Sequence, residues 1–201
     1  MEILQIICIP FKIEYFCYSL RLKCPLHLSD TKMDNSRNWY AVYTKPRYEK
    51  KLTTYLIDKG IEAYLPLRKT LRQWSDRKKI VEVPLMSSYV FVNVIHDQYY
   101  EVLNTPGAVK YIWFGGKPAI IPAKQIETLK LITSSDLEID CVSGTIPRGS
   151  RIRVTSGPLK DLTGELLNYA GKYKVIVRID HLDKVLMLTI SPQLLETMAD
   201  N

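Results

Sequence analysis

WYAVYTKPRYEKKLTTYLIDKG, residues 39–60, predicts a strand that leads into a helix. Residues 39–44 are mostly aromatic or β-branched, a composition typical of strands. Pro46 is expected to open the helix, because a proline at the first helical position loses no needed hydrogen bond. The helix should end near Lys59, with Gly60 supplying the left-handed stop. One helix face can then be buried while the other presents cations.

Strand and turn signals continue outward from this stretch to about residue 134. The expected order is a strand at 61–67, a hairpin at 70–83 that turns near Ser75, a central strand at 89–94, a short helix capped by Asp97, a strand at 108–114, a turn at Gly115 and Gly116, and a helix opened by Pro122. Helices alternating with strands in this way predict an α+β fold in which helices pack on a sheet.

The rest of the chain has a strand-like pattern throughout. Short strands are expected at 151–155, 164–167, 173–179 and 184–190. Strands this short and close favour a small barrel, because closing a sheet removes its edges. Residues 134–145 show little periodicity and are interpreted as a linker. The predicted organisation is an amino-terminal domain at 38–134, a linker at 135–147 and a carboxy-terminal domain at 148–201.

Basic residues are concentrated in one short segment. The chain of 201 residues has a net charge of +7, and residues 45–79 alone hold eleven basic and four acidic residues, which also gives +7. Such clustering favours contact with a nucleic-acid backbone. A solvent-exposed basic surface with no such partner is the alternative.

Residues 1–37 do not share the pattern of the rest and hold three of the four cysteines. We expect this extension to lie outside the fold, with Met33 as the true start and residues 1–32 as translated upstream sequence; an arm that packs on the domain is the alternative. No cysteine sits in a CxxC pair, and Cys24 and His27, which are spaced as two metal ligands are, have no second pair beside them. The cysteines therefore indicate free thiols in a reducing cytoplasm. No apolar stretch approaches the roughly 20 residues that span a membrane.

Several motifs, taken in order, resemble the NusG family of transcription elongation factors. Residues 39–46 resemble the opening of its amino-terminal domain, residues 89–92 its central strand, and residues 104–109 its NTPGV turn. Residues 152–159, followed by 162–164, look like a KOW motif. The resemblance runs from residue 38 to about residue 198. It implies an NGN domain, an α/β sandwich, followed by a small SH3-like KOW β-barrel.

The chain departs from the family pattern at two places. Met86-Ser87-Ser88 stands where the family usually has Phe-Pro-Gly, and Asp161 stands where the KOW motif often has glycine. Residues 114–122 resemble RfaH, and together with 43–47 and 156–160 they look most like the UpxY antiterminators of capsular-polysaccharide operons. A general NusG elongation factor and a KOW-type RNA- or ribosome-binding protein are the alternatives.

The resemblance implies a cytoplasmic, monomeric binding protein that docks on the clamp helices of RNA polymerase and suppresses pausing and termination. The docking face would comprise Tyr40, Tyr43, Leu85, Met86, Tyr89 and Phe91. For Tyr89 and Phe91, a structural role facing a helix is an equal alternative. No Walker loop, GxGxxG or HExxH motif occurs, so we expect neither enzymatic activity nor a cofactor or metal.

The basic segment would meet the non-template DNA of the elongation complex. The helix would contribute Lys45, Arg47, Tyr48, Lys50 and Lys51, and the hairpin Arg72, Trp74, Arg77, Lys78 and Lys79. Tyr48 would stack on a base, unless it belongs to the core. The KOW domain would contact Rho or a ribosomal protein through Leu162, or Leu162 would be ordinary core. Its glycines and β-branched residues predict lasting β structure rather than the helical refolding of RfaH.

Overall fold

The computed structural model describes residues 36–73, 77–135, 137–143, 149–169, 172–179, 181–182 and 184–198. The chain divides into two units, residues 1–34 and 35–201. The prediction for Met33 and the residues before it lies outside the described residues.

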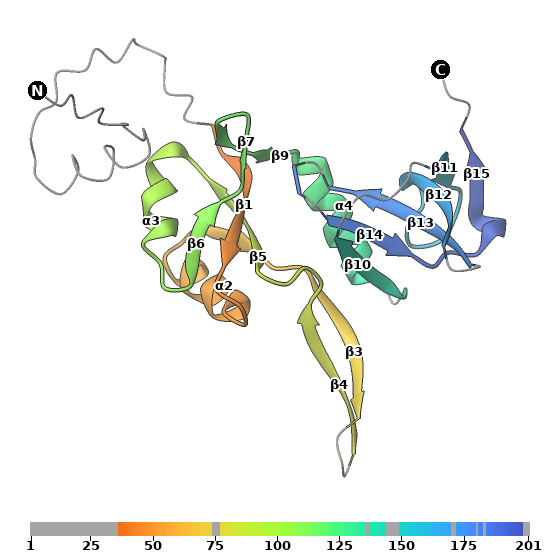
Figure 1. Ribbon diagram of the computed structural model, residues 1–201, viewed down its shortest axis with the longest axis horizontal. Helices are drawn as coiled ribbons and strands as arrows, with labels where there is room; N and C mark the ends of the chain where they lie inside the picture. Colours follow the sequence, from red (N-terminus) through yellow and green to blue (C-terminus); the bar gives the residue numbers. More distant parts are fainter. Residues whose placement is uncertain are drawn as a thin grey trace, which may run out of the picture. The chain divides into compact units, whose positions relative to one another are not determined.

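A five-stranded antiparallel sheet organises the first half of the second unit (Figure 1). It contains β1 (Asn38–Thr44), β2 (Glu62–Tyr64), β5 (Tyr89–Val94), β6 (Ala108–Tyr111) and β9 (Ile120–Ile121). The order is β2-β5-β1-β6, and β9 also pairs with β1. The prediction that residues 89–94 form a central strand is therefore confirmed.

Helices pack against this sheet, as predicted. They are α2 (Glu49–Asp58), α3 (Tyr99–Leu103), which follows a 3-10 turn (His96–Gln98), and α4 (Ala123–Ser134). Val42 and Val90 pack in one cluster with Leu52 and Leu56 of α2. Ala41 and Phe91 belong to a second cluster, with Ile126, Leu129 and Ile132 of α4. Successive side chains of a strand point to opposite faces, which is why neighbours in β1 and β5 join different clusters.

Several element boundaries differ from the predictions. Helix α2 begins at Glu49 rather than at Pro46, because Arg47 has a φ of 65° and belongs to a turn. The backbone N–H of Ile95 donates to the Gln98 side chain, and Asp97 does not cap the short helix. Strand β2 ends before Pro66, which cannot donate to a ladder. The strand predicted at 108–114 is split into β6 and β7 (Trp113–Phe114).

Two hairpins stand apart from the main sheet. Strands β3 (Leu67–Gln73) and β4 (Lys78–Pro84) pair over their full length, from Leu67 opposite Pro84 to Gln73 opposite Lys78. This hairpin is longer than predicted and forms a two-stranded sheet of its own. Strand β7 pairs with β8 (Lys117–Pro118) across Gly115 and Gly116, which both have positive φ values, as expected of the predicted turn.

The second half forms a six-stranded antiparallel sheet with the order β10-β14-β13-β12-β11-β15. The strands are β10 (Ile139–Ser143), β11 (Ser150–Val154), β12 (Thr163–Tyr169), β13 (Lys172–Arg178), β14 (Lys184–Leu188) and β15 (Leu195–Thr197), with a 3-10 turn (Pro192–Leu194) before the last. All four predicted strands are confirmed. Closure into an SH3-like KOW barrel stays a prediction.

The predicted linker is shorter in the structure. Strand β10 lies inside residues 134–145 and pairs with β14, with Cys141 opposite Leu186. The second sheet therefore begins at Ile139 rather than at residue 148. The sequence pattern does not predict this strand, because polar residues such as Asp140 and Ser143 interrupt the alternation between apolar and polar side chains.

Both departures from the family pattern fall on left-handed backbone. Ser88 has a φ of 64° and Asp161 a φ of 65°. Glycine adopts this region without strain, whereas a Cβ atom there costs about 1–2 kcal/mol. The Ser88 backbone holds its place through two hydrogen bonds: its N–H donates to Glu49 Oε1 at 2.8 Å and its carbonyl accepts from the Thr44 N–H at 2.9 Å.

We predict that Ser88→Gly raises the free energy of unfolding by up to about 1 kcal/mol, because it removes the Cβ strain and keeps both backbone hydrogen bonds. Urea denaturation measures the change. Ser87→Gly, at an exposed neighbour outside the left-handed region, is the control and should be neutral or destabilising. Equal destabilisation by both substitutions would contradict this account of Ser88.

Candidate functional site

A pair of aromatic rings lies on the α4 side of the first sheet. Tyr43 of β1 stands opposite Tyr89 of β5, and their rings meet edge to face with centroids 5.6 Å apart. Both side chains are half-buried. They share this side with Ala41 and Phe91, because alternate residues of a strand point the same way. The sheet therefore offers two partly accessible phenol rings at one place.

Tyr40, predicted to share a docking face with Tyr43, points to the other side of the sheet. Its ring meets the rings of Tyr99 and Tyr111 edge to face at 5.0 and 5.9 Å, and those two rings stack at 4.3 Å. Burial raises the pKa of Tyr99 and of Tyr111 above the ordinary phenol value, so both stay protonated. Tyr40 and Tyr43 therefore do not share one face, because residues three apart on a strand face opposite sides.

The other predicted docking residues are buried in this conformation. Leu85 is 4% exposed, and Met86 and Phe91 are fully enclosed. They belong to the cluster that contains residues of α4 and of the second sheet. Lys184 of β14 places its Nζ 5.6 Å from the centroid of the Tyr89 ring. Of the six predicted docking residues, Tyr43 and Tyr89 are the two that this conformation leaves partly accessible on the α4 side.

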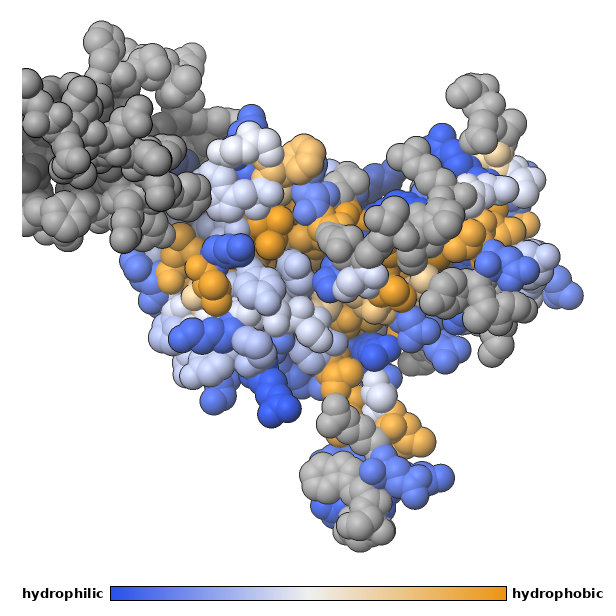
Figure 2. All heavy atoms as spheres, in the orientation of Figure 1, coloured by the Kyte–Doolittle hydropathy of each residue, from blue (hydrophilic) through white to orange (hydrophobic). Residues whose placement is uncertain are grey.

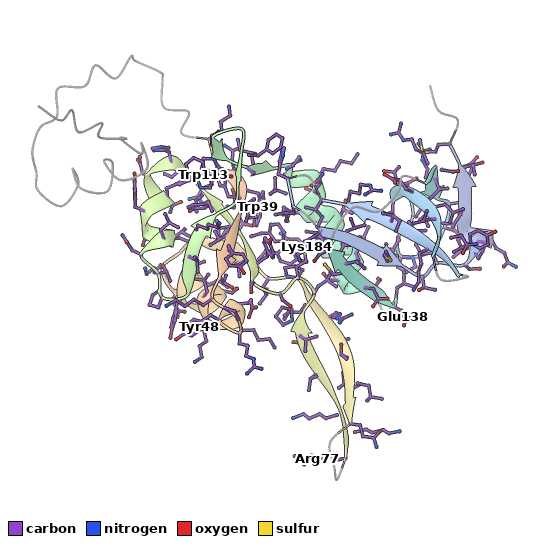
Figure 3. The ribbon with its side chains drawn as sticks, in the orientation of Figure 1. Trp39, Tyr48, Arg77, Trp113, Glu138 and Lys184 are labelled. Atoms are coloured by element: carbon purple, nitrogen blue, oxygen red, sulfur yellow. The ribbon has the colours of Figure 1, made fainter. Side chains whose placement is uncertain are left out.

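The basic residues around helix α2 are exposed, and Tyr48 sits among them (Figure 3). The Lys51 Nζ lies 5.2 Å from the centroid of the Tyr48 ring. On another side the ring packs against Gly107, where a Cβ atom would lie 2.5 Å from Tyr48 Cδ1. Tyr48 is therefore half-buried, packed on one side and accessible beside a cation on the other. The NTPG turn contributes a glycine that leaves room for this ring.

The remaining cations of the helix region differ in their surroundings. Lys50 Nζ donates to the Glu82 carbonyl at 2.8 Å and so links α2 to the base of the long hairpin. The backbone N–H of Lys45 donates to the Gly107 carbonyl. Arg47 is exposed in its left-handed turn.

The hairpin cations predicted to contact nucleic acid lie towards its far end, where Figure 3 labels Arg77. Arg77, Lys78 and Lys79 are exposed. Arg72 stands opposite Lys79 in the strand register, and Trp74 lies outside the described residues. The structure thus separates the predicted nucleic-acid residues into a helix group and a hairpin group.

Leu162 is 7% exposed and packs in the cluster that includes the second sheet. Its N–H donates to the Leu159 carbonyl, and its own carbonyl accepts from the Val154 N–H. These contacts match the core alternative for Leu162.

Two exposed aromatic residues were not predicted as site residues. Trp113 is 53% and Phe114 63% exposed, and the Phe114 ring lies 4.4 Å from that of His181. The glycine turn beside them was the sequence signal, since strand residues next to a tight hairpin turn are often exposed. Among the described residues, no three His, Cys, Asp or Glu side chains gather as a metal site, and no helix is long and apolar enough to cross a membrane.

The chain is similar to known proteins over most of its described part. Residues 37–130 match the family described as "Transcription termination factor nusG". "Transcription termination/antitermination protein NusG" of Bacillus subtilis (strain 168) is 26% identical over 161 residues, which cover 71% of this chain and 89% of that protein. The protein of that name from Thermus thermophilus is 27% identical over 168 residues, with coverages of 72% and 90%.

A solved structure, described as "Domain interaction in Thermotoga maritima NusG", has a similar fold. It superposes with a TM-score of 0.52 at 20% sequence identity. The match covers 82% of this chain and 98% of that chain.

Proposed function

We propose, on the premise that residues 37–130 belong to the NusG family, that this chain is a transcription antiterminator that binds elongating RNA polymerase. The observation that carries the proposal is the Tyr43–Tyr89 ring pair on the same domain as an exposed basic helix. The names of the bacterial relatives, which include termination and antitermination, support the same class of activity.

The ring pair is the proposed contact with the clamp helices of the polymerase. Tyrosine supplies a large apolar area and a polar hydroxyl, and it is enriched among residues that dominate binding energy. Phe91 lies on the same face of β5 as Tyr89 and is fully buried in the cluster against which Tyr89 packs, so its proposed role is to support this face. Lys184 lies over Tyr89, so a clamp helix that covers this ring displaces the lysine.

The helix group is the proposed contact with the non-template strand. Arg47 and Lys51 are exposed cations, and Tyr48 is a half-buried ring with the Lys51 ammonium near its face. Cations that follow a backbone, combined with an aromatic ring for stacking, are typical of single-strand binding. Simultaneous contact with polymerase and DNA favours the elongating state, and a ligand that binds one state better shifts the equilibrium towards it.

The finer assignment is an antiterminator of specific operons such as capsular-polysaccharide loci, acting in the cytoplasm. Residues 114–122, which resemble RfaH, support it. The second sheet is the proposed site for a ribosomal protein or Rho. A general elongation factor is the second candidate, because the relatives found carry the general NusG name. Transcript profiling after depletion separates the two: changes confined to a few operons support specialisation, and genome-wide changes reject it.

We predict that the double substitution Tyr43→Ala and Tyr89→Ala weakens binding to core RNA polymerase at least about tenfold, as loss of a dominant interface residue does. Biolayer interferometry with immobilised core enzyme measures the affinity. Tyr100→Ala, which removes a 55% exposed ring from α3, is the matched control and should bind normally. An equal loss in the control would reject the ring pair as the contact, and thermal unfolding verifies that each variant is folded.

We predict that the double substitution Arg47→Glu and Lys51→Glu weakens binding to an elongation complex with an exposed non-template strand. It should also reduce the slope of log affinity against log salt by about 1.4, since each single-strand phosphate contact contributes about 0.7. Thermal unfolding should be nearly unchanged, because both side chains are exposed. Fluorescence anisotropy over a salt series measures the slope.

The charge-matched control for this prediction is Lys117→Glu with Lys124→Glu, at two exposed lysines away from α2. If the control changes the slope equally, net charge alone explains the binding. If the Arg47 and Lys51 variant unfolds, those residues are structural and the assignment fails.

A further inference from the structure

The long hairpin carries an exposed apolar pair that a nucleic-acid contact leaves unexplained. Leu71 of β3 stands directly opposite Ile80 of β4, and the two side chains are 61% and 65% exposed. Figure 2 shows apolar residues exposed along this hairpin, above its hydrophilic end. Large aliphatic side chains placed together on a free hairpin indicate a contact surface.

At this pair the hairpin departs from the usual pattern of a ribbon. Strand alternation places Leu71 and Ile80 on one face and Thr70 and Val81 on the other. Thr70 and Val81 are partly covered, whereas the Leu71 face is open. A solvent-facing side of an antiparallel pair normally carries polar residues and the covered side carries the apolar ones. Here the larger apolar residues occupy the more open face.

The hairpin is anchored at its base rather than through this pair. The Leu85 N–H donates to the Pro66 carbonyl, Lys50 Nζ to the Glu82 carbonyl and an Arg68 guanidinium nitrogen to the Ile139 carbonyl. A two-stranded hairpin alone is marginally stable in water. β-branched polar residues would maintain the strand pairing at positions 71 and 80 without exposing large apolar area. The pair is therefore better explained by a partner than by folding.

Charge and chemistry select the class of partner. Residues 67–84 contain six basic and two acidic residues, a net charge of +4, so a second copy of the hairpin would be repelled. Nucleic acid offers phosphates that bind cations and bases that stack on aromatic rings. Leu71 and Ile80 are aliphatic, so neither kind of contact suits them. Lys78 shares their face on the side of the hairpin tip, where it would meet a carboxylate.

We infer that Leu71 and Ile80 dock on an apolar protein surface rimmed by acidic residues, while Lys79 on the other face serves the nucleic acid. The inference rests on the proposed function, under which this surface belongs to RNA polymerase. The hairpin then has one face for protein and one for phosphate. Its contact is separate from the Tyr43–Tyr89 contact, because it lies on a different sheet.

The test uses the full chain with Leu71→Thr and Ile80→Thr, since threonine keeps the strand propensity and removes the apolar area. The probes are core RNA polymerase without nucleic acid and, separately, a bubble-containing DNA duplex without protein. The variant should bind polymerase about tenfold more weakly and the DNA normally. The substitution Lys79→Gln should weaken binding to the DNA and leave the affinity for polymerase unchanged. Ile57→Thr, at a 56% exposed residue of α2, is the matched control for both.

Each other outcome overturns the inference. Weaker DNA binding by the threonine variant would show that Leu71 and Ile80 insert into nucleic acid rather than dock on a protein. If the threonine variant binds polymerase as tightly as the Ile57→Thr control does, Leu71 and Ile80 do not contact the polymerase. The exchange Leu71→Ile with Ile80→Leu keeps the apolar surface and must retain full affinity, which separates docking from a folding defect. If the unaltered chain does not bind polymerase, the proposed function itself fails, a result distinct from a selective loss in the variant.

Discussion

The antiparallel pairing of β1 with β5 is the constraint on which the rest of the structure depends. Its register places Tyr43 opposite Tyr89 and Val42 opposite Val90. Because neighbouring side chains point to opposite faces, one register decides which residues meet α2 and α3 and which meet α4. A slip of one residue would exchange the two sets, removing the valines from one core cluster and the tyrosine pair from the proposed docking place.

Much of this arrangement follows from local sequence signals. The aromatic and β-branched run of β1, the turn at Gly115 and Gly116, and the helix that follows Pro122 are confirmed, because each depends on nearby residues alone. The site was harder to predict. Tyr40 and Tyr43 look equivalent as sequence, and their assignment to opposite faces is visible only when strand alternation is applied strictly.

Other features depend on contacts between distant segments. Strand β10 forms because β14 offers it a partner, and its own sequence alternates poorly. The burial of Met86 depends on packing across segments far apart in the chain. Arg47 and Ser88 adopt left-handed conformations that a preference for glycine would not predict. Ser88 keeps its place through the buried Glu49 carboxylate and the Thr44 N–H, both supplied by other elements.

These placements give the chain binding surfaces of distinct chemistry: a ring pair, a basic helix with Tyr48, and a hairpin with unlike faces. The central claim is that the ring pair meets the polymerase. The most direct test places a photocrosslinking amino acid at position 43, 89 or 100 and irradiates the chain with core RNA polymerase. The account predicts crosslinks to the large polymerase subunits from positions 43 and 89 and none from position 100. Crosslinks from position 100 alone would contradict it.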